Sequence, residues 1–414
     1  MSQLLLHNAR LILNDGIKRG GVIVREGRIA QVFSDQQTPA GFGAADTVDL
    51  SGAYLAPGMI DIHIHGSAGV DAQNASDDAL QTLSDFLLTE GVTGYFATFV
   101  PTDESGYQQA IAAVESFIAA QRNAAQQGQP RGAQILGIHF EGPFVSRHRC
   151  GALKTEHFRT YDGDPRSLDL FTANRTDGLA YARLMTLAPE VAGGLDLIRE
   201  LTTRGTRPFI GHTDADAATL DAAFEAGARH ITHFPNALAP LHHRKPGTIA
   251  WSLLRDDVTI DCIADFHHVH PMMLRLMTKA KTPHRMALIS DAIQPAGLGD
   301  GTFKVWDIEI AVKDGLTALV EGPGAGTIAG SVITMREALR NITRTGVSLS
   351  DAARMASSIP ARAASLDDYG LIEAGKRADL IAFDDNFTVQ LALIGGAVAL
   401  NKEHDRIADP SPSL

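Results

Sequence analysis

The chain has 414 residues, of which 44% are hydrophobic and 20% are charged, as expected for a globular protein that can bury a large core. Its 36 basic and 48 acidic residues give a formal net charge of −12. This charge argues against binding to nucleic acids or to an anionic membrane surface. An anionic substrate would need a local group of basic side chains.

The cysteine content and the N-terminus indicate the cellular compartment. Two cysteines, Cys150 and Cys262, are too few for a disulfide framework. The first residues lack the basic and apolar regions of a secretory signal, and the sequence contains no run of about 18 apolar residues that could span a membrane. We therefore predict a cytoplasmic protein without membrane or nucleic-acid partners.

Both ends of the chain predict short strands separated by turns. The strand-like stretches lie at residues 4–6, 21–24, 28–32, 378–383 and 390–394. Asn14-Asp15-Gly16 and Gly395-Gly396 are typical turn sequences between such strands. The two ends are therefore expected to combine into one small β-sandwich.

The middle of the chain alternates strand-like runs with stretches of helical composition. The strand-like runs lie at residues 59–65, 92–99, 134–141, 183–189, 207–212, 230–233, 258–265 and 285–291. Helical composition is clearest at residues 78–89, 107–125 and 217–226. Eight such repeats predict an α/β protein built on a (β/α)8 TIM barrel.

The expected organisation is a barrel inserted between the two parts of a sandwich. Residues 1–56 and 369–403 would form the β-sandwich, and residues 57–368 would form the barrel. The remaining residues, 404–414, end in Asp-Pro-Ser-Pro-Ser-Leu and are predicted to be a loose tail.

Barrel enzymes carry their catalytic groups at the carboxyl-terminal ends of the strands, and five of the predicted strands end in residues suited to metal binding. These residues are His63, His65, Glu141, His212, His233 and Asp291. His63 and His65 are two positions apart, so their side chains share one face of the strand. Imidazole and carboxylate ligands predict a divalent metal site that could hold zinc, iron, cobalt or manganese.

Each of these residues also has an ordinary structural interpretation. A single histidine at a strand end is usually a surface or core residue, Glu141 could cap a loop, and Asp291 could cap a helix. Six suitable ligands at the same end of five strands together favour the metal site. Asp291 could also accept a proton from an attacking water and pass it to the leaving group.

Several motifs resemble a known family. The segment from Pro57 to Gly66, with its His63-Ile64-His65, and Gly375-Lys376-Arg377-Ala378-Asp379-Leu380-Ile381 resemble the amidohydrolase superfamily. A narrower resemblance, to the N-acetylglucosamine-6-phosphate deacetylase family, covers nearly the whole chain. Its motifs are His139-Phe140-Glu141-Gly142-Pro143-Phe144, Gly211-His212-Thr213, Thr232-His233-Phe234-Pro235-Asn236-Ala237-Leu238, Arg244-Lys245-Pro246-Gly247, Ala264-Asp265-Phe266-His267-His268-Val269, Ser290-Asp291-Ala292 and Gly326-Thr327-Ile328-Ala329-Gly330-Ser331.

The resemblance implies a metal-dependent hydrolase that removes the acetyl group of an N-acetylated amino-sugar 6-phosphate. In such an enzyme Glu141, His212 and His233 would hold the main metal ion. The pair His63 and His65 matches family members that can hold a second ion.

The resemblance also implies roles around the metal. Asp291 would accept and donate the proton, and His268 would contact the sugar and polarise the acetyl carbonyl. Further substrate contacts would come from Asn236, Ala237, Ala152, Leu153, Ile328, Ala329 and Gly330. Arg244 would bind the phosphate and reach across a homodimer interface into the neighbouring subunit's site. The sequence itself also supports this role, since Arg244 and Lys245 lie in the densest basic cluster near any predicted strand end. The structural alternative is that this cluster is simply a solvated surface loop.

The sequence departs from the family in the loop after Glu141. Where the family usually has a histidine, this chain has Leu153, which cannot form a side-chain hydrogen bond; Lys154 or His157 could substitute for it. The departure leaves open N-acetylgalactosamine 6-phosphate or another N-acyl sugar as the substrate.

Three other functions agree less well with the sequence. A cyclic amidase would need a bridging lysine where Glu141 stands, and the His139-Phe140-Glu141-Gly142-Pro143-Phe144 segment argues against a deaminase. A non-catalytic sugar-phosphate sensor is disfavoured because all the metal ligands and Asp291 are present.

Overall fold

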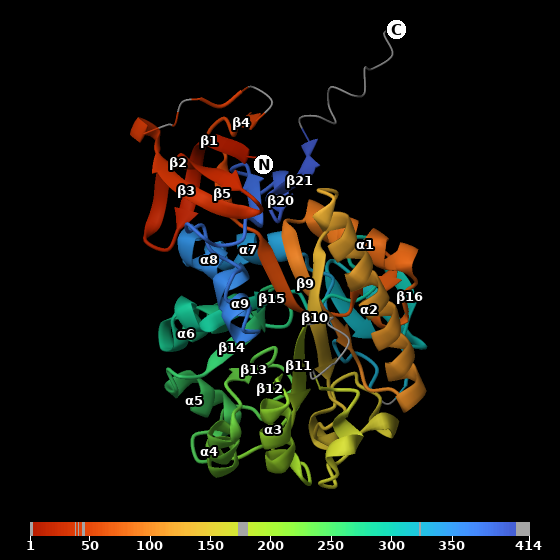
Figure 1. The fold of residues 1–414 in the computed structure, drawn as a ribbon. Coiled ribbons are helices and arrows are strands. Elements are labelled where there is room, and N and C mark those ends of the chain that lie inside the picture. The colour runs from red at the N-terminus through yellow and green to blue at the C-terminus, as the bar shows by residue number, and fades with distance from the viewer. Residues whose placement is uncertain are drawn as a thin grey trace.

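The structure, a computed structural model, describes residues 3–402 apart from residues 38, 40, 44–45, 173–180 and 323. The predicted tail, residues 404–414, therefore lies outside the described residues. The N-terminal strands, in red, and the C-terminal strands, in blue, lie together at one end of the molecule, and the barrel occupies the other end (Figure 1).

Eight parallel strands form the barrel, and all eight strands predicted in the middle of the chain are confirmed. They are β6 (Met59–Ile64), β9 (Val92–Phe99), β10 (Gln134–Glu141), β11 (Ala182–Leu187), β12 (Thr206–Ile210), β13 (His230–Ile231), β14 (Thr259–Ile263) and β15 (Met286–Ile289). Each strand pairs with the next in chain order. The barrel closes where the backbone N–H of Asp291, after β15, donates to the carbonyl of His63 in β6 at 2.9 Å.

The helices follow the strands and pack outside them. They are α1 (Asp77–Thr89), α2 (Glu104–Gln126), α3 (Gly194–Thr203), α4 (Ala217–Ala226), α5 (Gly247–Leu254), α6 (Pro271–Lys281), α7 (Met335–Arg344), α8 (Leu349–Ala356) and α9 (Ser358–Ala363). Several begin at a side chain that accepts a backbone N–H of the first turn: Ser76 caps α1, Asp103 caps α2 and Asp216 caps α4. These caps fix where each helix starts after its strand.

Both ends of the chain contribute to one sheet with its own core, which confirms the predicted β-sandwich. Its strands are β1 (Gln3–Leu13), β2 (Gly16–Arg25), β3 (Arg28–Ser34), β4 (Thr47–Asp49), β5 (Tyr54–Pro57), β19 (Leu380–Phe383), β20 (Val389–Ile394) and β21 (Ala397–Asn401). The join is antiparallel pairing of β5 with β19. Apolar side chains from both termini, among them Leu6, Val22, Leu55 and Leu380, pack into the core. The exact domain boundaries at residues 56 and 369 stay predictions.

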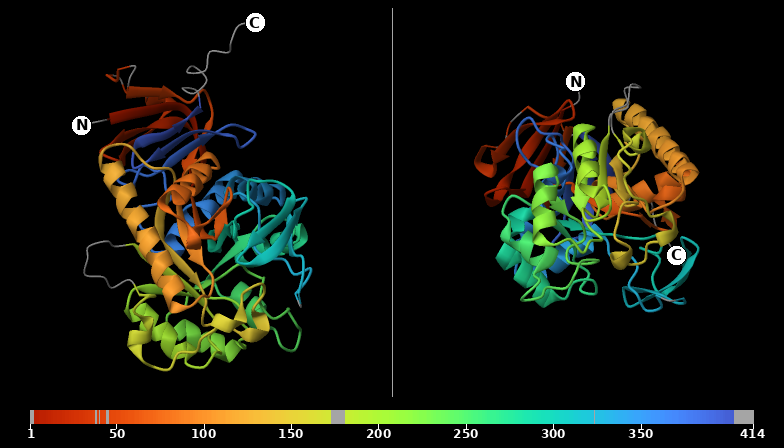
Figure 2. Two further views of the ribbon diagram at one scale, coloured as in Figure 1. Left: turned by 90° about the vertical axis from the view of Figure 1, so that its right-hand side faces the viewer. Right: turned by 90° about the horizontal axis from the view of Figure 1, so that it is seen from below.

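Two small sheets after β6 and β15 were not predicted. One is the pair β7 (Gly66–Ser67) and β8 (Val70–Asp71). The other is the antiparallel sheet of β16 (Gly301–Val305), β17 (Ile308–Lys313) and β18 (Leu316–Leu319). The left view of Figure 2 shows the second sheet, in teal to blue, projecting at the side of the barrel. These insertions place additional residues at the rim of the barrel, and the β/α repeat pattern does not predict those residues.

Three of the strands that were predicted to end at a metal ligand end before that ligand. The strands β12, β13 and β15 each end two residues before a predicted metal ligand, namely His212, His233 and Asp291. These ligands have φ values of 48°, 33° and 49°, which non-glycine residues adopt uncommonly and which concentrate at functional sites. The chain therefore leaves each strand by a sharp turn that holds the ligand.

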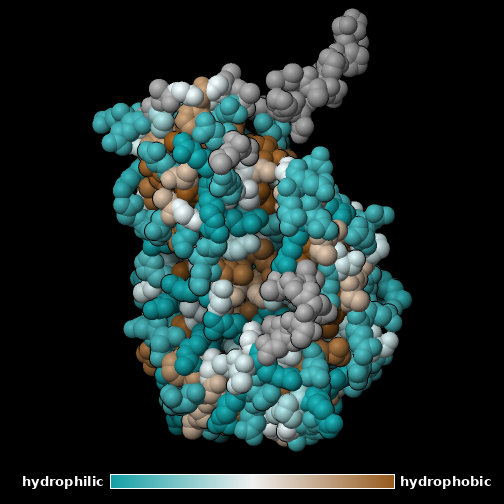
Figure 3. Space-filling view, viewed as in Figure 1, coloured by the Kyte–Doolittle hydropathy of each residue, from teal (hydrophilic) through white to brown (hydrophobic). Residues whose placement is uncertain are grey.

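Hydrophilic residues cover most of the face shown in Figure 3, and hydrophobic residues, in brown, appear there in smaller areas. Among the described residues no helix combines the length and the apolar character needed to cross a bilayer.

Candidate active site

Six side chains predicted to bind metal converge in two buried groups at the carboxyl-terminal end of the barrel. The groups consist of Glu141, His212 and His233 in the first, and His63, His65 and Asp291 in the second. Within each group, one possible ligand atom from each residue lies within 4.8 Å of the others. The structure therefore brings together residues that lie up to 228 positions apart in the sequence.

Glu141 is the centre of the first group. Its Oε1 lies 3.0 Å from Nε2 of His212 and 3.1 Å from Nε2 of His233. The two imidazole Nε2 atoms are 3.0 Å from each other. The last residue of β10 and the turns after β12 and β13 thus direct one carboxylate and two rings at the same point.

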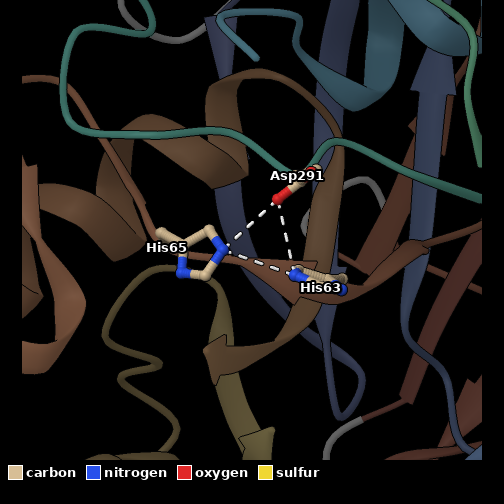
Figure 4. A group of neighbouring side chains, drawn as sticks. All are labelled: His63, His65 and Asp291. Carbon is tan, nitrogen blue, oxygen red and sulfur yellow. Dashed lines mark hydrogen bonds and ion pairs between the residues drawn. The ribbon is translucent and has the colours of Figure 1, made fainter. Parts of the chain in front are cut away.

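Asp291 faces the histidine pair at the end of β6, His63 and His65, in the second group (Figure 4). Its Oδ1 lies 3.4 Å from Nε2 of His63 and 3.3 Å from Nε2 of His65, and the two Nε2 atoms are 3.3 Å apart. Glu141 connects the groups, since its Oε2 is 3.3 Å from Nε2 of His65. The two groups form one continuous cluster of ligands.

The hydrogen bonds of His212 test whether this cluster suits a cation. Its Nδ1 lies 2.6 Å from the backbone carbonyl oxygen of Arg149, and because a carbonyl only accepts, Nδ1 carries the proton. In the neutral ring Nε2 then has a lone pair, which faces Glu141 and His233. Lone pairs at such distances repel unless a cation lies between them. The nitrogen and oxygen donor set fits a divalent transition metal such as zinc.

Burial and ionic contacts shift the protonation of the ligands. Burial lowers the pKa of His65, but its bonds to Asp291 and Glu141 outweigh burial and raise it to about 10. Burial likewise opposes charge on His233, and Glu141 raises the pKa of His233 to about 9. Although burial opposes ionisation of Glu141, its bonds to His212, His233 and His65 hold its pKa well below the usual range. In the protein alone, protons therefore compete for the nitrogen atoms that a metal would use.

We predict that metal affinity rises with pH beyond the range of ordinary histidine titration. A metal must displace the protons of His65 and His233, whose pKa values are about 10 and about 9, so affinity should rise up to about tenfold per pH unit for each proton released. Metal titration at pH 6, 7, 8 and 9 with a competing chelator measures this dependence. An affinity that levels off above pH 7 would contradict it.

A layer of buried polar groups supports the ligands from below. His139 contacts the carbonyl of Ile62 through Nδ1 at 2.7 Å and the hydroxyl of Thr186 through Nε2 at 2.8 Å, and burial lowers its pKa to about 4. Asp261 accepts the backbone N–H of His233 and contacts Nε2 of His230 at 2.8 Å. These contacts fix the turn that presents His233.

Asp61 is a second buried carboxylate of this layer that sequence reasoning did not single out. It accepts the hydroxyl of Ser290 and the backbone N–H of His63 at 3.3 Å, and burial raises its pKa to about 7. It precedes His63 by two positions, so the same alternation that pairs His63 with His65 could have identified it.

A pocket of about 240 Å³ opens above the metal ligands. Its lining residues are His65, Glu141, Gly151, Ala152, Leu153, His212, His233, Asn236, Ala237, His268, Asp291, Trp306, Thr327, Ile328, Ala329 and Gly330. All the predicted substrate contacts except Arg244 are in this set. Leu153 lines the pocket, and neither Lys154 nor His157 is among the lining residues, so neither predicted substitute for the missing histidine lines this wall.

His268 has a fixed partner at the pocket wall. Its Nδ1 lies 2.6 Å from Oδ2 of Asp265, whose Oδ1 also accepts the backbone N–H of His268 at 2.8 Å. Burial opposes ionisation of Asp265, but the bond from His268 outweighs burial and keeps the Asp265 pKa below its ordinary value. A charged carboxylate therefore orients the ring of His268.

Trp306 is the largest of the pocket residues that the sequence did not predict, the others being Gly151 and Thr327. It lies in the turn between β16 and β17 with φ of 50°, and its ring centroid is 5.0 Å from that of His65 in an edge-on arrangement. The unpredicted sheet therefore supplies one wall of the pocket. No motif or strand end marked this position, because the insertion lies outside the barrel repeat.

Arg244 lies away from the pocket of its own chain. The loop from Leu241 to Pro246 is exposed, and the Arg244 guanidinium contacts Nε2 of His243 at 2.7 Å. Among the described residues that line the pocket there is no lysine or arginine. A phosphate on the substrate would therefore need a basic group from elsewhere.

Comparison with known proteins identifies the family. A model of the amidohydrolase family matches residues 54–399. The N-acetylglucosamine-6-phosphate deacetylase of Bacillus subtilis (strain 168) is 36% identical over 397 residues, which cover 95% of this chain and 96% of that protein. The N-acetylgalactosamine-6-phosphate deacetylase of Escherichia coli O157:H7 is 36% identical over 347 residues, covering 83% of this chain and 87% of that protein.

Solved structures agree with this assignment. A mutant N-acetyl-D-glucosamine-6-phosphate deacetylase from Mycobacterium smegmatis, in complex with N-acetyl-D-glucosamine-6-phosphate, is 30% identical with a TM-score of 0.82, covering 97% of this chain and 100% of that chain. The deacetylase from Pasteurella multocida superposes with a TM-score of 0.84 at 26% identity, covering 96% of this chain and 100% of that chain. The chain therefore belongs to the amidohydrolase family and, within it, to the N-acetylglucosamine-6-phosphate deacetylases, hydrolases that act on an amide.

Proposed function

We propose that this protein hydrolyses the acetamide of N-acetylglucosamine 6-phosphate to acetate and the free amine. The observation that carries the proposal is the convergence of Glu141, His212, His233 and Asp291 beneath a pocket that also contains His268. The Bacillus subtilis and Mycobacterium smegmatis relatives carry the name of this reaction. A cytoplasmic location and a homodimer belong to the same proposal.

In this proposal Glu141, His212 and His233 hold the main divalent ion, with zinc as the first candidate. His63 and His65, facing Asp291, form the place for a second ion. When bound, the ion lowers the pKa of water and polarises the carbonyl under attack. No cysteine is among the described ligands, which suits an open catalytic centre rather than a closed structural zinc site.

The chain's own residues perform the proton transfers. Asp291 accepts a proton from the attacking water while the oxygen bonds to the acetyl carbon. The ring of His268, oriented by Asp265, stabilises the carbonyl oxygen as negative charge develops there. Asp291 then delivers its proton to the amine nitrogen, the C–N bond breaks, and acetate leaves.

The remaining pocket residues would hold the sugar. Asn236 donates its side-chain N–H to the carbonyl of His233 at 3.0 Å, which leaves its amide oxygen available for a sugar hydroxyl. Ala237, Ala152, Ile328, Ala329 and Gly330 complete the wall with small or apolar groups and with backbone. Leu153 adds an apolar contact where the family usually presents a histidine.

The phosphate would be bound by Arg244 of a second copy of the chain. Two observations support this: the pocket wall lacks lysine and arginine among its described residues, and Arg244 is exposed on a loop outside the pocket. A dianionic phosphate needs a concentrated basic group on a protein of net charge −12.

The Arg244→Ala variant should lose activity on phosphorylated sugars selectively. We expect kcat/KM for N-acetylglucosamine 6-phosphate to fall about 100-fold, because a charge-assisted bidentate contact contributes roughly 3 kcal/mol, with no change for the unphosphorylated sugar. Lys245→Ala, from the same loop, is the matched control. Mixing the impaired Arg244→Ala subunit with the Asp291→Asn subunit should restore activity on the phosphorylated sugar, because a mixed dimer contains one intact site. No recovery on mixing would contradict the shared site.

The substrate test is a screen for acetate release from N-acetylated hexosamines with and without a 6-phosphate. The proposal expects N-acetylglucosamine 6-phosphate to give the highest kcat/KM. A preference for N-acetylgalactosamine 6-phosphate would instead favour the function named for the Escherichia coli relative. Equal activity on unphosphorylated sugars would remove the role of Arg244.

A further inference from the structure

A second pocket lies at the amino-terminal end of the barrel, at the opposite ends of the strands that carry the metal ligands. It has a volume of about 160 Å³ and is bounded by the starts of β12, β13 and β14, the residue before β15, and the end of α9. Four arginines line it, namely Arg207, Arg229, Arg285 and Arg362, together with one carboxylate, Asp257. No other pocket described above has this concentration of one charge.

The four arginines are not neutralised within the described part of the chain. None of them forms an ion pair with a described carboxylate, and Asp257 is already bound by Arg255 at 3.2 Å. Four positive charges and one negative charge leave three positive charges around the pocket. This excess stands out on a chain whose formal charge is −12.

Two of the guanidinium groups are held in place by backbone carbonyls. Arg362 donates to the carbonyl of His284 at 2.8 Å, and Arg229 donates to the carbonyl of Ala228 at 2.9 Å. The Arg229 guanidinium also lies 3.6 Å above the centre of the Phe224 ring. Burial and the neighbouring Arg285 lower the pKa of Arg362. The protein thus holds like charges close together, and an anion between them would relieve their repulsion.

This pocket is separate from the substrate site. Arg207 precedes His212 by five residues along β12 and its turn, a separation of about 16 Å for extended chain. Its lining shares no residue with the pocket above the metal ligands. An anion bound here would therefore not be the phosphate of a substrate in the active site of the same chain.

We propose that this arginine pocket binds a small phosphate-bearing anion. Guanidinium groups present paired N–H donors that match the oxygens of phosphate, and the pocket has room for one tetrahedral oxyanion. Inorganic phosphate and the phosphate group of a monoester offer the same chemistry. A monoester would place its phosphate among the arginines and its remaining atoms toward solvent.

The test is calorimetric titration of the metal-loaded full-length protein at constant ionic strength. Inorganic phosphate and glucose 6-phosphate, which has no acetamide to hydrolyse, are titrated separately, with sodium chloride as the reference. We expect saturable binding of at least one of these anions, weakened about tenfold or more in Arg285→Gln and in Arg362→Gln. Arg204→Gln, which removes an arginine paired with Asp169, is the control and should bind as the parent does.

Comparing the two anions shows whether the ligand is free phosphate or a phosphate monoester. Binding of phosphate alone identifies the free ion as the ligand, and tighter binding of glucose 6-phosphate identifies a monoester. If Arg285→Gln or Arg362→Gln fails to fold, Arg207→Gln, at an exposed position, serves as the substitute. Absence of saturable binding by the parent protein, or equal affinity in all folded pocket variants, would overturn the proposal. Neither readout depends on acetate release, so the deacetylase proposal can fail or stand independently.

Discussion

The Asp291→Asn variant should bind metal at the Glu141 group and lose its turnover. Asparagine keeps the size of the side chain but cannot accept and return the proton, so we expect kcat to fall about 1,000- to 10,000-fold, as for loss of a general acid–base group. Because Glu141, His212 and His233 are unchanged, at least one metal equivalent should remain. The measurement pairs the rate of acetate release with metal analysis of the same sample.

The control for this variant is Asp314→Asn. Asp314 has φ of 51°, close to the 49° of Asp291, but lies in an exposed turn outside the pocket. Asp314→Asn therefore makes the same substitution at a residue with positive φ that takes no part in the proposed proton transfer. Normal turnover in Asp291→Asn, or an equal loss in Asp314→Asn, would refute the proton-transfer role.

The Glu141→Gln variant should lose metal as well as activity. Glu141 contacts His65, His212 and His233 at 3.0 to 3.3 Å, and its carboxylate supplies the negative charge of the first ligand group. Loss of a residue that only hydrogen-bonds to a metal ligand lowers metal affinity roughly 10- to 100-fold. Loss of the ligand Glu141 should lower metal affinity by more than this. Titration with a fluorescent zinc chelator measures this change.

Glu90→Gln provides the matched control for removing a paired carboxylate. Glu90 is bound by Arg336 at 2.8 Å and is not among the residues that line either pocket. It should lower stability modestly and leave metal affinity unchanged. Retention of parental metal affinity by Glu141→Gln would mean that the metal is held elsewhere.

Much of the fold follows from local patterns in the sequence. The barrel strands β9 and β10 begin and end at the predicted residues, because continuous apolar runs buried on both faces have clear limits. Helix α4 likewise matches its predicted range, with Asp216 capping its start. The limits of these elements are determined by the local sequence, so they can be predicted from one sequence alone.

The metal site was predictable because barrel geometry places strand ends together. His63, His65 and Glu141 lie in or directly after strands whose limits the sequence shows. The turns that hold His212 and Asp291 at positive φ were not predictable, because tertiary hydrogen bonds impose that backbone conformation against the preference of these residue types.

The parts that the sequence did not indicate depend on contacts between distant segments. Trp306 reaches His65 only because an inserted sheet folds back over the rim. Asp61 gains its role from Ser290, 229 positions away. The arginine pocket likewise joins residues in or next to four barrel strands with residues of α9, and no single segment of the chain is basic enough to suggest it.

The most direct test of a metal-dependent deacetylase is acetate release from N-acetylglucosamine 6-phosphate before chelation, after chelation and after zinc is restored. We predict that the purified protein releases one acetate per amine formed, that removal of the metal abolishes release, and that one or two equivalents of zinc per chain restore it. Full activity in protein shown to contain no metal, or no acetate release by fully loaded protein, would contradict the proposed chemistry.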